Sequence, residues 1–208
     1  MNRYTDWGWG QQVEYEQDLE IIYKLDAESG FENAYSKEVA QGTGLYGELD
    51  KNAVEHMLEH YRDYFSNRNG AFYDLGSGTG KVVSHVALRS QLSKVCGIEL
   101  DKIRFDKSKK LIDTLSFPHA TPEIINGDFF DQDYSDATVM YFDNTMWNEH
   151  FENDRSYVDR LFKTIKPGTL IMTKELIPHI VGHARHLSLP TSYDWTPAYA
   201  LVFLAFRP

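Results

Sequence analysis

The feature that most constrains this chain is an apolar segment that runs into a glycine-rich turn and then into a helical pattern. Residues 71–75 are mostly apolar, and Gly76-Ser77-Gly78-Thr79-Gly80 follows them directly. From Lys81 to Leu88 the apolar residues recur at helical spacing. Alternate glycines let a backbone approach a ligand closely, because no Cβ intervenes and positive φ costs little. The pattern predicts a strand, a ligand-binding turn and a helix whose first amides face the ligand.

The glycine spacing argues against two common ligands of such turns. A phosphate-binding P-loop has four residues between its glycines and then Lys-Ser or Lys-Thr, whereas here three residues separate Gly76 from Gly80 and Val82 follows Lys81. The dinucleotide fingerprint G-x-G-x-x-G fails at its third glycine, where Lys81 stands. NAD therefore remains only the weaker alternative.

Two further positions specify the ligand. Glu99 ends a second short apolar strand, 19 residues after Gly80, where a carboxylate can accept both ribose hydroxyls of an adenosine. Gly127-Asp128-Phe129 follows a third predicted strand, and there Asp128 can accept from the adenine amine while Phe129 offers a backbone N–H and a ring face. In this order the positions fit S-adenosylmethionine better than NAD.

A fourth position concerns the chemistry. The strand-like run 137–142 is followed by Asp143-Asn144-Thr145-Met146-Trp147. In methyltransferases that act on amines, an Asn or Asp here accepts a hydrogen bond from the target N–H, beside an aromatic ring. Asn144 and Trp147 suit these roles. The alternative is an ordinary Asp-Asn turn with Trp147 packed in the core.

Taken together, these residues resemble the disruptor-of-telomeric-silencing (Dot-one) family, histone lysine methyltransferases built on a Rossmann-like domain instead of a SET domain. The resemblance spans roughly residues 40 to 205. It is carried by Tyr46-Gly47-Glu48, Asp74-Leu75-Gly76-Ser77-Gly78, Gly97-Ile98-Glu99, Gly127-Asp128-Phe129, Asn144 with Trp147, and Trp195-Thr196. The chain departs from the family at Leu49, where a hydroxyl residue is usual, at Lys81, where an amide is usual, and in having no long basic flank.

The resemblance implies a role for each matching position. Glu48 and Asp74 would hold the methionine end of the cofactor, and Asn144 would border a lysine channel walled by Trp147 and Tyr199. The expected cofactor-binding residues are Tyr46, Glu48, Asp74, Gly76, Ser77, Gly78, Gly80, Glu99, Leu100, Asp128, Phe129 and Asn144.

Strands and helices alternate along most of the chain, which favours a mostly parallel sheet covered on both faces. The expected fold is α/β, a Rossmann-like class I methyltransferase with seven strands, an antiparallel C-terminal hairpin and a helical N-terminal cover. Residues 1–45 would form the cover and a cofactor loop, and residues 46–208 the methyltransferase domain. Expected strands are 71–75, 94–99, 123–126, 137–143, 169–175, 186–189 and 201–206, and expected helices are 11–25, 51–65, 81–90, 102–115 and 153–165.

Charge and composition narrow the partners and the setting. With 31 acidic and 21 basic residues, the formal net charge is −10. This charge disfavours nucleic acid and favours a basic protein such as a histone tail. The sequence contains no apolar run long enough to predict a membrane span, and no secretory signal is visible. The single cysteine, Cys96, favours a reducing intracellular compartment, cytoplasmic or nuclear.

Two patterns resemble metal sites. His56, Glu59 and His60 match the zinc motif H-x-x-E-H, but they share a polar helix face with Glu55, so a solvated surface is the favoured interpretation. A second cluster, His179, His183 and His186, does not share one face if extended, so no metal is expected. The basic residues of 102–110 are interpreted as a solvated helix face balanced by aspartates.

The sequence thus predicts an S-adenosylmethionine-dependent methyltransferase whose substrate is a lysine on a protein, with histones among the candidates. Two alternatives stay open: an N-methyltransferase acting on a small amine or a nucleobase, and a cofactor-binding protein without turnover. The oligomeric state is not indicated.

Overall fold

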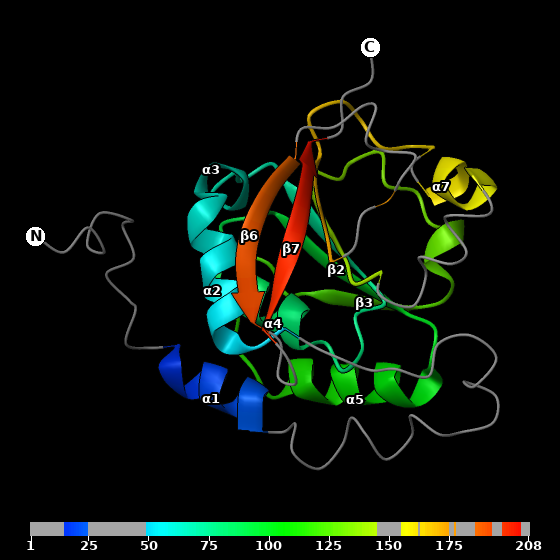
Figure 1. Cartoon of the computed structure of the whole chain (residues 1–208). Coiled ribbons are helices and arrows are strands. Elements are labelled where there is room, and N and C mark those ends of the chain that lie inside the picture. The colour runs from blue at the N-terminus through cyan, green and yellow to red at the C-terminus, as the bar shows by residue number, and fades with distance from the viewer. Residues whose placement is uncertain are drawn as a thin grey trace, which may run out of the picture.

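The computed structural model describes residues 15–24, 49–144, 155–161, 163–174, 177, 186–192 and 197–204. A seven-stranded sheet forms its centre (Figure 1). The strands are β1 (Ala71–Leu75), β2 (Lys94–Glu99), β3 (Glu123–Asn126), β4 (Val139–Phe142), β5 (Leu170–Thr173), β6 (His186–Ser192) and β7 (Pro197–Leu204). The helices are α1 (Glu16–Lys24), α2 (Lys51–His60), α3 (Arg62–Phe65), α4 (Lys81–Arg89), α5 (Lys102–Asp113), α7 (Arg155–Leu161) and the short 3-10 helix η3 (Phe129–Asp131).

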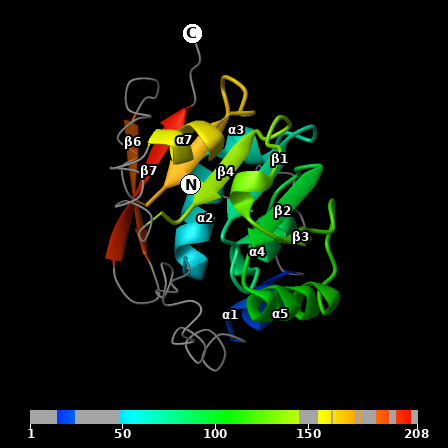
Figure 2. The same ribbon diagram turned by 90° about the vertical axis from the view of Figure 1, so that its right-hand side faces the viewer.

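The strands lie in the order β3-β2-β1-β4-β5-β7-β6. Strands β1 to β5 are parallel, and β7 runs antiparallel to both β5 and β6. Figure 2 shows β3 and β6 at opposite edges of the sheet. The predicted α/β fold with a mostly parallel, Rossmann-like sheet is therefore confirmed.

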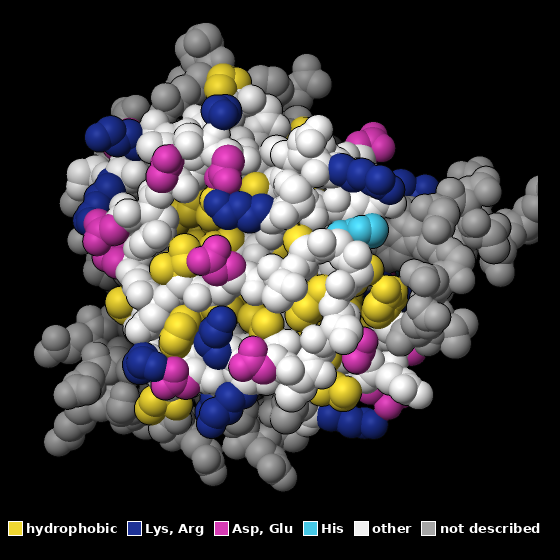
Figure 3. Space-filling model, turned by 180° about the vertical axis from the view of Figure 1, so that it is seen from behind, with side chains coloured by type: hydrophobic (Ala, Val, Ile, Leu, Met, Phe, Trp, Pro, Cys, Tyr) yellow, Lys and Arg dark blue, Asp and Glu magenta, His cyan; other side chains and the backbone are white. Residues whose placement is uncertain are grey.

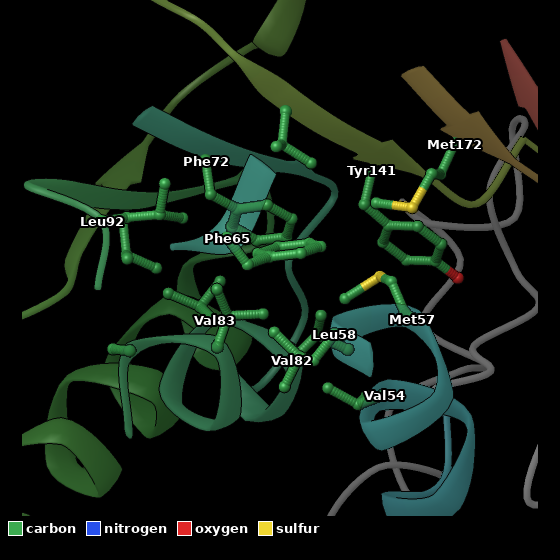
Figure 4. Packing of buried hydrophobic residues seen from close by; sticks show 14 of the residues in the cluster. Val54, Met57, Leu58, Phe65, Phe72, Val82, Val83, Leu92, Tyr141 and Met172 are labelled. Carbon is green, nitrogen blue, oxygen red and sulfur yellow. The ribbon is translucent and has the colours of Figure 1, made fainter. Parts of the chain in front are cut away.

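The central strands are buried on both faces because each contributes alternate side chains to two hydrophobic clusters. From β1, Phe72 belongs to a cluster with residues of α2, α3 and α4, some of which Figure 4 shows. Its neighbour Tyr73 belongs to a second cluster that includes Val158 and Leu161 of α7. The two clusters place helices on opposite faces of the sheet.

Helix α1 is held by a third, smaller cluster. Leu19 and Ile22 of α1 are completely buried against Leu88 of α4 and Leu111 of α5. Figures 1 and 2 both show α1 beside α5 at the same end of the molecule. The described part of the predicted N-terminal cover is thus a helix packed against α4 and α5.

The element boundaries agree with the sequence prediction for β1, β2 and β3, and differ elsewhere. The expected helix 51–65 is wrong as one unit, because Tyr61 has φ −106° and ψ 33° and divides it into α2 and α3. Strand β7 begins at Pro197, before the expected start at Leu201. The expected loop 42–47 and the domain division at residue 45 lie outside the described residues.

The surface mixes both signs of charge. On the face opposite to that of Figure 1, acidic and basic side chains are interspersed (Figure 3). On α5, Lys102 pairs with Asp106, in agreement with a solvated, balanced helix face. None of the described helices combines the length and the apolar character that a bilayer crossing requires.

The zinc-like motif lies on the exposed side of α2. His56, Glu59 and His60 are all exposed. In the described part of the chain, no three His, Cys, Asp or Glu side chains gather as a metal site would require. Of the second histidine cluster, His179 and His183 lie outside the described residues.

Candidate active site

Ten of the predicted site residues lie at the carboxyl edge of the sheet, which is where its parallel strands end. In the parallel ladders Leu75 pairs with both Ile98 and Phe142, and Glu99 pairs with Asn126. Because parallel strands end at the same edge, the segments that follow β1, β2, β3 and β4 lie side by side. This edge gathers Asp74, Gly76, Ser77, Gly78, Gly80, Glu99, Leu100, Asp128, Phe129 and Asn144.

The glycine turn requires its glycines. Gly76, Gly78 and Gly80 have φ angles of 80°, 57° and 83°, a region that other residues rarely adopt. A Cβ added to Gly76 would meet no atom within 4 Å. The turn therefore presents open backbone surface at Gly76, as a closely approaching ligand needs.

The amides of this turn are used within the protein. Gly76 and Ser77 both donate to the Ile98 carbonyl, at 2.9 and 3.0 Å, and Gly80 donates to the Ser77 carbonyl at 2.9 Å. Gly78 donates to Glu99 Oε2 at 2.8 Å. The turn thus differs from a phosphate cradle, which aims its amides at the ligand. It suits a ligand held by contact and by carboxylates.

Gly97 in β2 lets the turn pack closely, and sequence reasoning gave it no structural role. A Cβ at Gly97 would lie 2.5 Å from Ser77 Oγ and 2.7 Å from Ile124 Cδ1. The Ser77 hydroxyl is buried, has no hydrogen-bond partner among the described residues and lies against β2 at this point. The signal in the sequence is a glycine inside an apolar strand, which often marks a close approach of another backbone.

Glu99 is buried, with 5% of its side chain exposed. Its Oε2 accepts from Gly78 N–H and its Oε1 from Asp101 N–H, both at 2.8 Å. Burial raises the pKa of Glu99, and these amide bonds oppose the rise. Each carboxylate oxygen has a second lone pair, so Glu99 can still accept from the two hydroxyls of a ribose.

Asp74, at 3% exposure, has a different environment. Its carboxylate accepts no hydrogen bond from the described residues. Burial raises the pKa of Asp74 well above its ordinary value, and the nearby charges of Glu99 and Asp143 raise it further. A buried carboxylate with no donor is costly unless a cation pairs with it. The site therefore fits a ligand that brings a positive charge.

Asp128 and Phe129 form the next part of the edge. Asp128 Oδ1 accepts from Phe130 N–H at 2.8 Å and so caps η3. The Phe129 ring packs against the Phe130 and Phe142 rings, with centroids 4.5 and 5.2 Å apart. Leu100, the residue that follows β2, is 69% exposed. An apolar rim with one carboxylate is suited to a purine.

Asn126 supports this edge, although sequence reasoning did not single it out. Its Nδ2 donates to the carbonyls of Glu99 and Leu100, at 2.9 and 3.1 Å. The side chain therefore fixes the loop between β2 and α5. A polar amide at the end of a parallel strand was the available signal.

The corner after β4 is only partly described. Asn144 is completely buried, and Asp143 beside it is partly exposed and close enough for its charge to act on Asp74. Tyr199 pairs with Pro190 in the β6–β7 ladder. Tyr46, Glu48 and Trp147, and the side chain of Tyr199, lie outside the described residues.

Comparison with known proteins agrees with this geometry. The model of the family described as histone methylation protein DOT1 matches residues 33–186. A protein-lysine N-methyltransferase of Saccharolobus islandicus (strain REY15A) is 28% identical over 131 residues, which are 62% of this chain and 75% of that protein.

Solved structures share the fold. An RNA methyltransferase from Salinibacter ruber, solved with S-adenosyl-L-homocysteine, has a TM-score of 0.57 at 23% identity, covering 77% of this chain and 95% of that one. An rRNA methylase from Streptococcus thermophilus has a TM-score of 0.53 at 12% identity, covering 77% of this chain and 100% of that one. The predicted methyltransferase fold is confirmed by these similarities.

Proposed function

This chain belongs to the DOT1 family of histone methylation proteins. We propose that it binds S-adenosylmethionine at the carboxyl edge of its sheet and transfers the methyl group to a lysine of a histone. The family match and the protein-lysine N-methyltransferase relative both support S-adenosylmethionine-dependent methyl transfer to a lysine of a protein. The histone as substrate and the residue roles below are the specific content of the proposal.

The observation that carries the proposal is the environment of Asp74. Its carboxylate is buried, has no donor in the described part of the chain and has a raised pKa. S-adenosylmethionine carries two positive charges, on the methionine ammonium and on the sulfonium. An ammonium within reach of Asp74 would donate the missing hydrogen bonds and neutralise its charge. NAD carries no such ammonium and brings two phosphates, which the acidic edge disfavours.

The remaining parts of the cofactor would each be bound by other residues of the site. Glu99 would accept from the ribose hydroxyls, Asp128 and Phe129 would hold the adenine, and Gly76 would allow the close approach of the ligand to the turn. Tyr46 and Glu48 would complete the methionine end. Each assignment matches a donor or acceptor to the chemistry of the group that it would meet.

When bound, the cofactor supplies a methyl group on a positively charged sulfur, ready for in-line displacement. The lysine must be neutral to react, and with a free pKa near 10.4 its deprotonation costs about 4 to 5 kcal/mol at pH 7. Walls formed by Trp147 and Tyr199 would lower this cost by disfavouring the cation. Asn144 would accept from the amine N–H and orient its lone pair, so that alignment accounts for most of the catalysis. No general base is assigned.

The experiment that tests the substrate is incubation with radiolabelled S-adenosylmethionine. Nucleosomes, free histones, total RNA and a soluble cell lysate are treated in parallel. We expect label in histone protein. Label confined to other proteins would replace the histone, and label only in RNA or small molecules would overturn lysine as the acceptor.

The role of Asn144 is tested by Asn144→Ala, with Asn69→Ala at an exposed position as the control. We expect kcat to fall by roughly 10- to 100-fold, because the amine loses its orientation, while the Kd for S-adenosylhomocysteine stays nearly unchanged. Thermal melting checks that the buried substitution leaves the protein folded. Equal losses in kcat and cofactor affinity would reject the assignment.

A further inference from the structure

Away from the cofactor edge, a polar cluster joins three helices. Its members are Glu16 and Tyr23 of α1, Lys51 and Glu55 of α2, and His85 and Arg89 of α4. His85 is completely buried and Arg89 is 7% exposed. Glu55, expected on the solvated face of its helix, is instead half-buried and bonded to both His85 and Arg89.

His85 lies in the middle of this cluster. Tyr23 Oη is 2.8 Å from His85 Nδ1, and His85 Nε2 is 3.0 Å from Glu55 Oε1. An ionised Glu55 can only accept, so Nε2 carries the proton and the Nδ1 of a neutral ring accepts from the Tyr23 hydroxyl. The two bonds of one neutral imidazole therefore connect α1 to α2 through α4.

The ion pairs around His85 strengthen the same connections. Arg89 Nε donates to Glu55 Oε1 at 3.0 Å, and an Arg89 terminal nitrogen donates to Glu16 Oε1 at 3.1 Å. Lys51 Nζ lies 2.6 Å from Glu16 Oε2. Tyr23 also faces the buried Lys81, whose Nζ lies 5.9 Å from the centroid of its ring. Lys81 is the first residue of α4 after the glycine turn.

The cluster favours neutral His85. Burial lowers the pKa of His85, the Glu55 hydrogen bond raises it, and the charges of Arg89 and Lys51 lower it again, with a net lowering. Burial would raise the pKa of Glu55, but its bonds to His85 and Arg89 lower it overall. A protonated ring would present donors on both nitrogens beside Arg89, and Tyr23 could then no longer donate to Nδ1.

The three helices adjoin, along the chain, segments that contain predicted cofactor-binding residues. Helix α1 ends at Lys24 and α2 begins at Lys51, so they flank the segment 25–48 that contains Tyr46 and Glu48. Helix α4 begins directly after Gly80 of the glycine turn. The bonds of His85 therefore join the two helices that flank that segment to the helix that follows the turn.

We propose that neutral His85 is a positioning residue for cofactor binding, which fixes α1 through Tyr23 and α2 through Glu55 against the helix that starts at the glycine turn. This inference rests on the proposed function, since the affinity that it sets is that for S-adenosylmethionine. Loss of the cluster would weaken cofactor binding more than it slows methyl transfer at saturating cofactor.

The test measures the Kd for S-adenosylhomocysteine by calorimetry, together with kcat and KM. In His85→Phe, which keeps a ring but removes both bonds, we expect Kd to rise by roughly 10-fold or more with kcat nearly unchanged. In Tyr23→Phe, which removes one bond, we expect a smaller rise. Glu20→Gln breaks an exposed ion pair on the same helix and is the matched control, expected to leave Kd unchanged.

Rescue and pH dependence separate positioning from a purely structural role. His85→Gln supplies a donor for Glu55 and an acceptor for Tyr23, so it should restore most of the affinity. In the wild type, Kd should rise as the pH falls, because His85 is protonated and because the raised pKa values of Asp74 and Glu99 bring these carboxylates closer to protonation. In His85→Gln only the part due to the carboxylates should remain, so the rise should be smaller. An unchanged Kd in both His85→Phe and Tyr23→Phe, or a rise in His85→Gln as large as in the wild type, would overturn the inference.

A third measurement does not depend on the cofactor. Hydrogen exchange of α1 amides, such as Leu19 N–H bonded to the Tyr15 carbonyl, should be faster in His85→Phe than in Glu20→Gln. Equal exchange would overturn the inference even if the proposed function holds. Absence of S-adenosylhomocysteine binding by the wild type would instead reject the proposed function itself.

Discussion

At the scale of single residues, two buried carboxylates at the same sheet edge have different partners. Glu99 accepts from two backbone amides, at 2.8 Å each. Asp74 has no donor in the described part of the chain, and its pKa is raised by burial and by Glu99 and Asp143. Glu99 is therefore oriented by the fold itself, whereas ionised Asp74 lowers the stability of the ligand-free protein and, under the proposed function, would gain its partner from the cofactor.

We predict that Asp74→Asn has opposite effects on stability and binding. Because the pKa of Asp74 is higher in the folded than in the unfolded protein, its ionisation destabilises the ligand-free fold as pH rises above the unfolded value, and it contributes no penalty in acid. The ligand-free variant should be more stable than wild type at pH 8, with the difference shrinking on acidification. Its affinity for S-adenosylhomocysteine should fall by about 30- to 1,000-fold, as for loss of a buried charge partner.

Denaturant unfolding at several pH values and calorimetry measure the two effects of Asp74→Asn. Asp113→Asn, at an exposed position, is the control and should change neither. A variant less stable than wild type at pH 8 would contradict the assigned environment of Asp74.

A second prediction at this scale concerns Gly97→Ala. The new Cβ would lie within 2.5 to 2.7 Å of Ser77 and Ile124 atoms, so the glycine turn must shift. We expect a loss of about 1 to 3 kcal/mol in the free energy of unfolding, as for overpacking, and weaker cofactor binding. In the control Gly127→Ala, the nearest atom would lie at 3.6 Å, an ordinary contact. Similar unfolding free energies for the two variants would argue against this packing.

At the scale of elements, the packing of α1 determines whether the N-terminal cover unfolds together with the rest of the protein. Its Leu19 and Ile22 are completely buried, whereas Ile21 is 39% exposed. Burial of two large side chains against α4 and α5 makes α1 part of the cooperative fold.

We predict that Leu19→Ala lowers the free energy of unfolding by about 2 to 5 kcal/mol, because it leaves a cavity between α1, α4 and α5. Ile21→Ala, on the exposed side of the same helix, should change it by less than about 1 kcal/mol. Chemical denaturation measures both. If the two variants proved equally stable, α1 would not be packed as described.

At the scale of the whole molecule, the net charge of −10 should act on the choice of acceptor. An acidic protein attracts a basic partner over a distance set by the ionic strength, about 8 Å at 0.15 M. The charges visible in Figure 3 are of both signs, so this attraction is a property of the total charge rather than of one patch on that face.

We therefore predict that salt weakens substrate binding more than cofactor binding. Raising the ionic strength from about 0.05 to 0.3 M should increase the KM for a lysine-rich protein several-fold through screening, while the Kd for S-adenosylhomocysteine changes little. Steady-state kinetics and calorimetry over a salt series measure the two constants. A KM that stays constant or falls with salt would show that net charge has no part in acceptor binding.

Some of this protein could be read from local patterns in the chain. The bounds of β1, β2 and β3 were predictable because short apolar runs end at glycines or charged residues. The site residues follow from these bounds, since side chains at the ends of parallel strands must meet at one edge. The division of α2 from α3 was not predictable, because the apolar stripe continues through Tyr61 and only packing sets its backbone angles.

The sequence by itself determined the parallel sheet, the glycine turn and the carboxylates around it, because each depends on residues close together in the chain or on strand ends that the topology must align. Only the tertiary structure decided that Asp74 accepts no hydrogen bond from the described residues. Only it, too, brought His85 into contact with Tyr23 and Glu55, which are 62 and 30 residues away from it in the chain. The reason is physical: periodicity fixes which face of an element is buried, but the partner of a buried polar group is chosen by how distant elements pack.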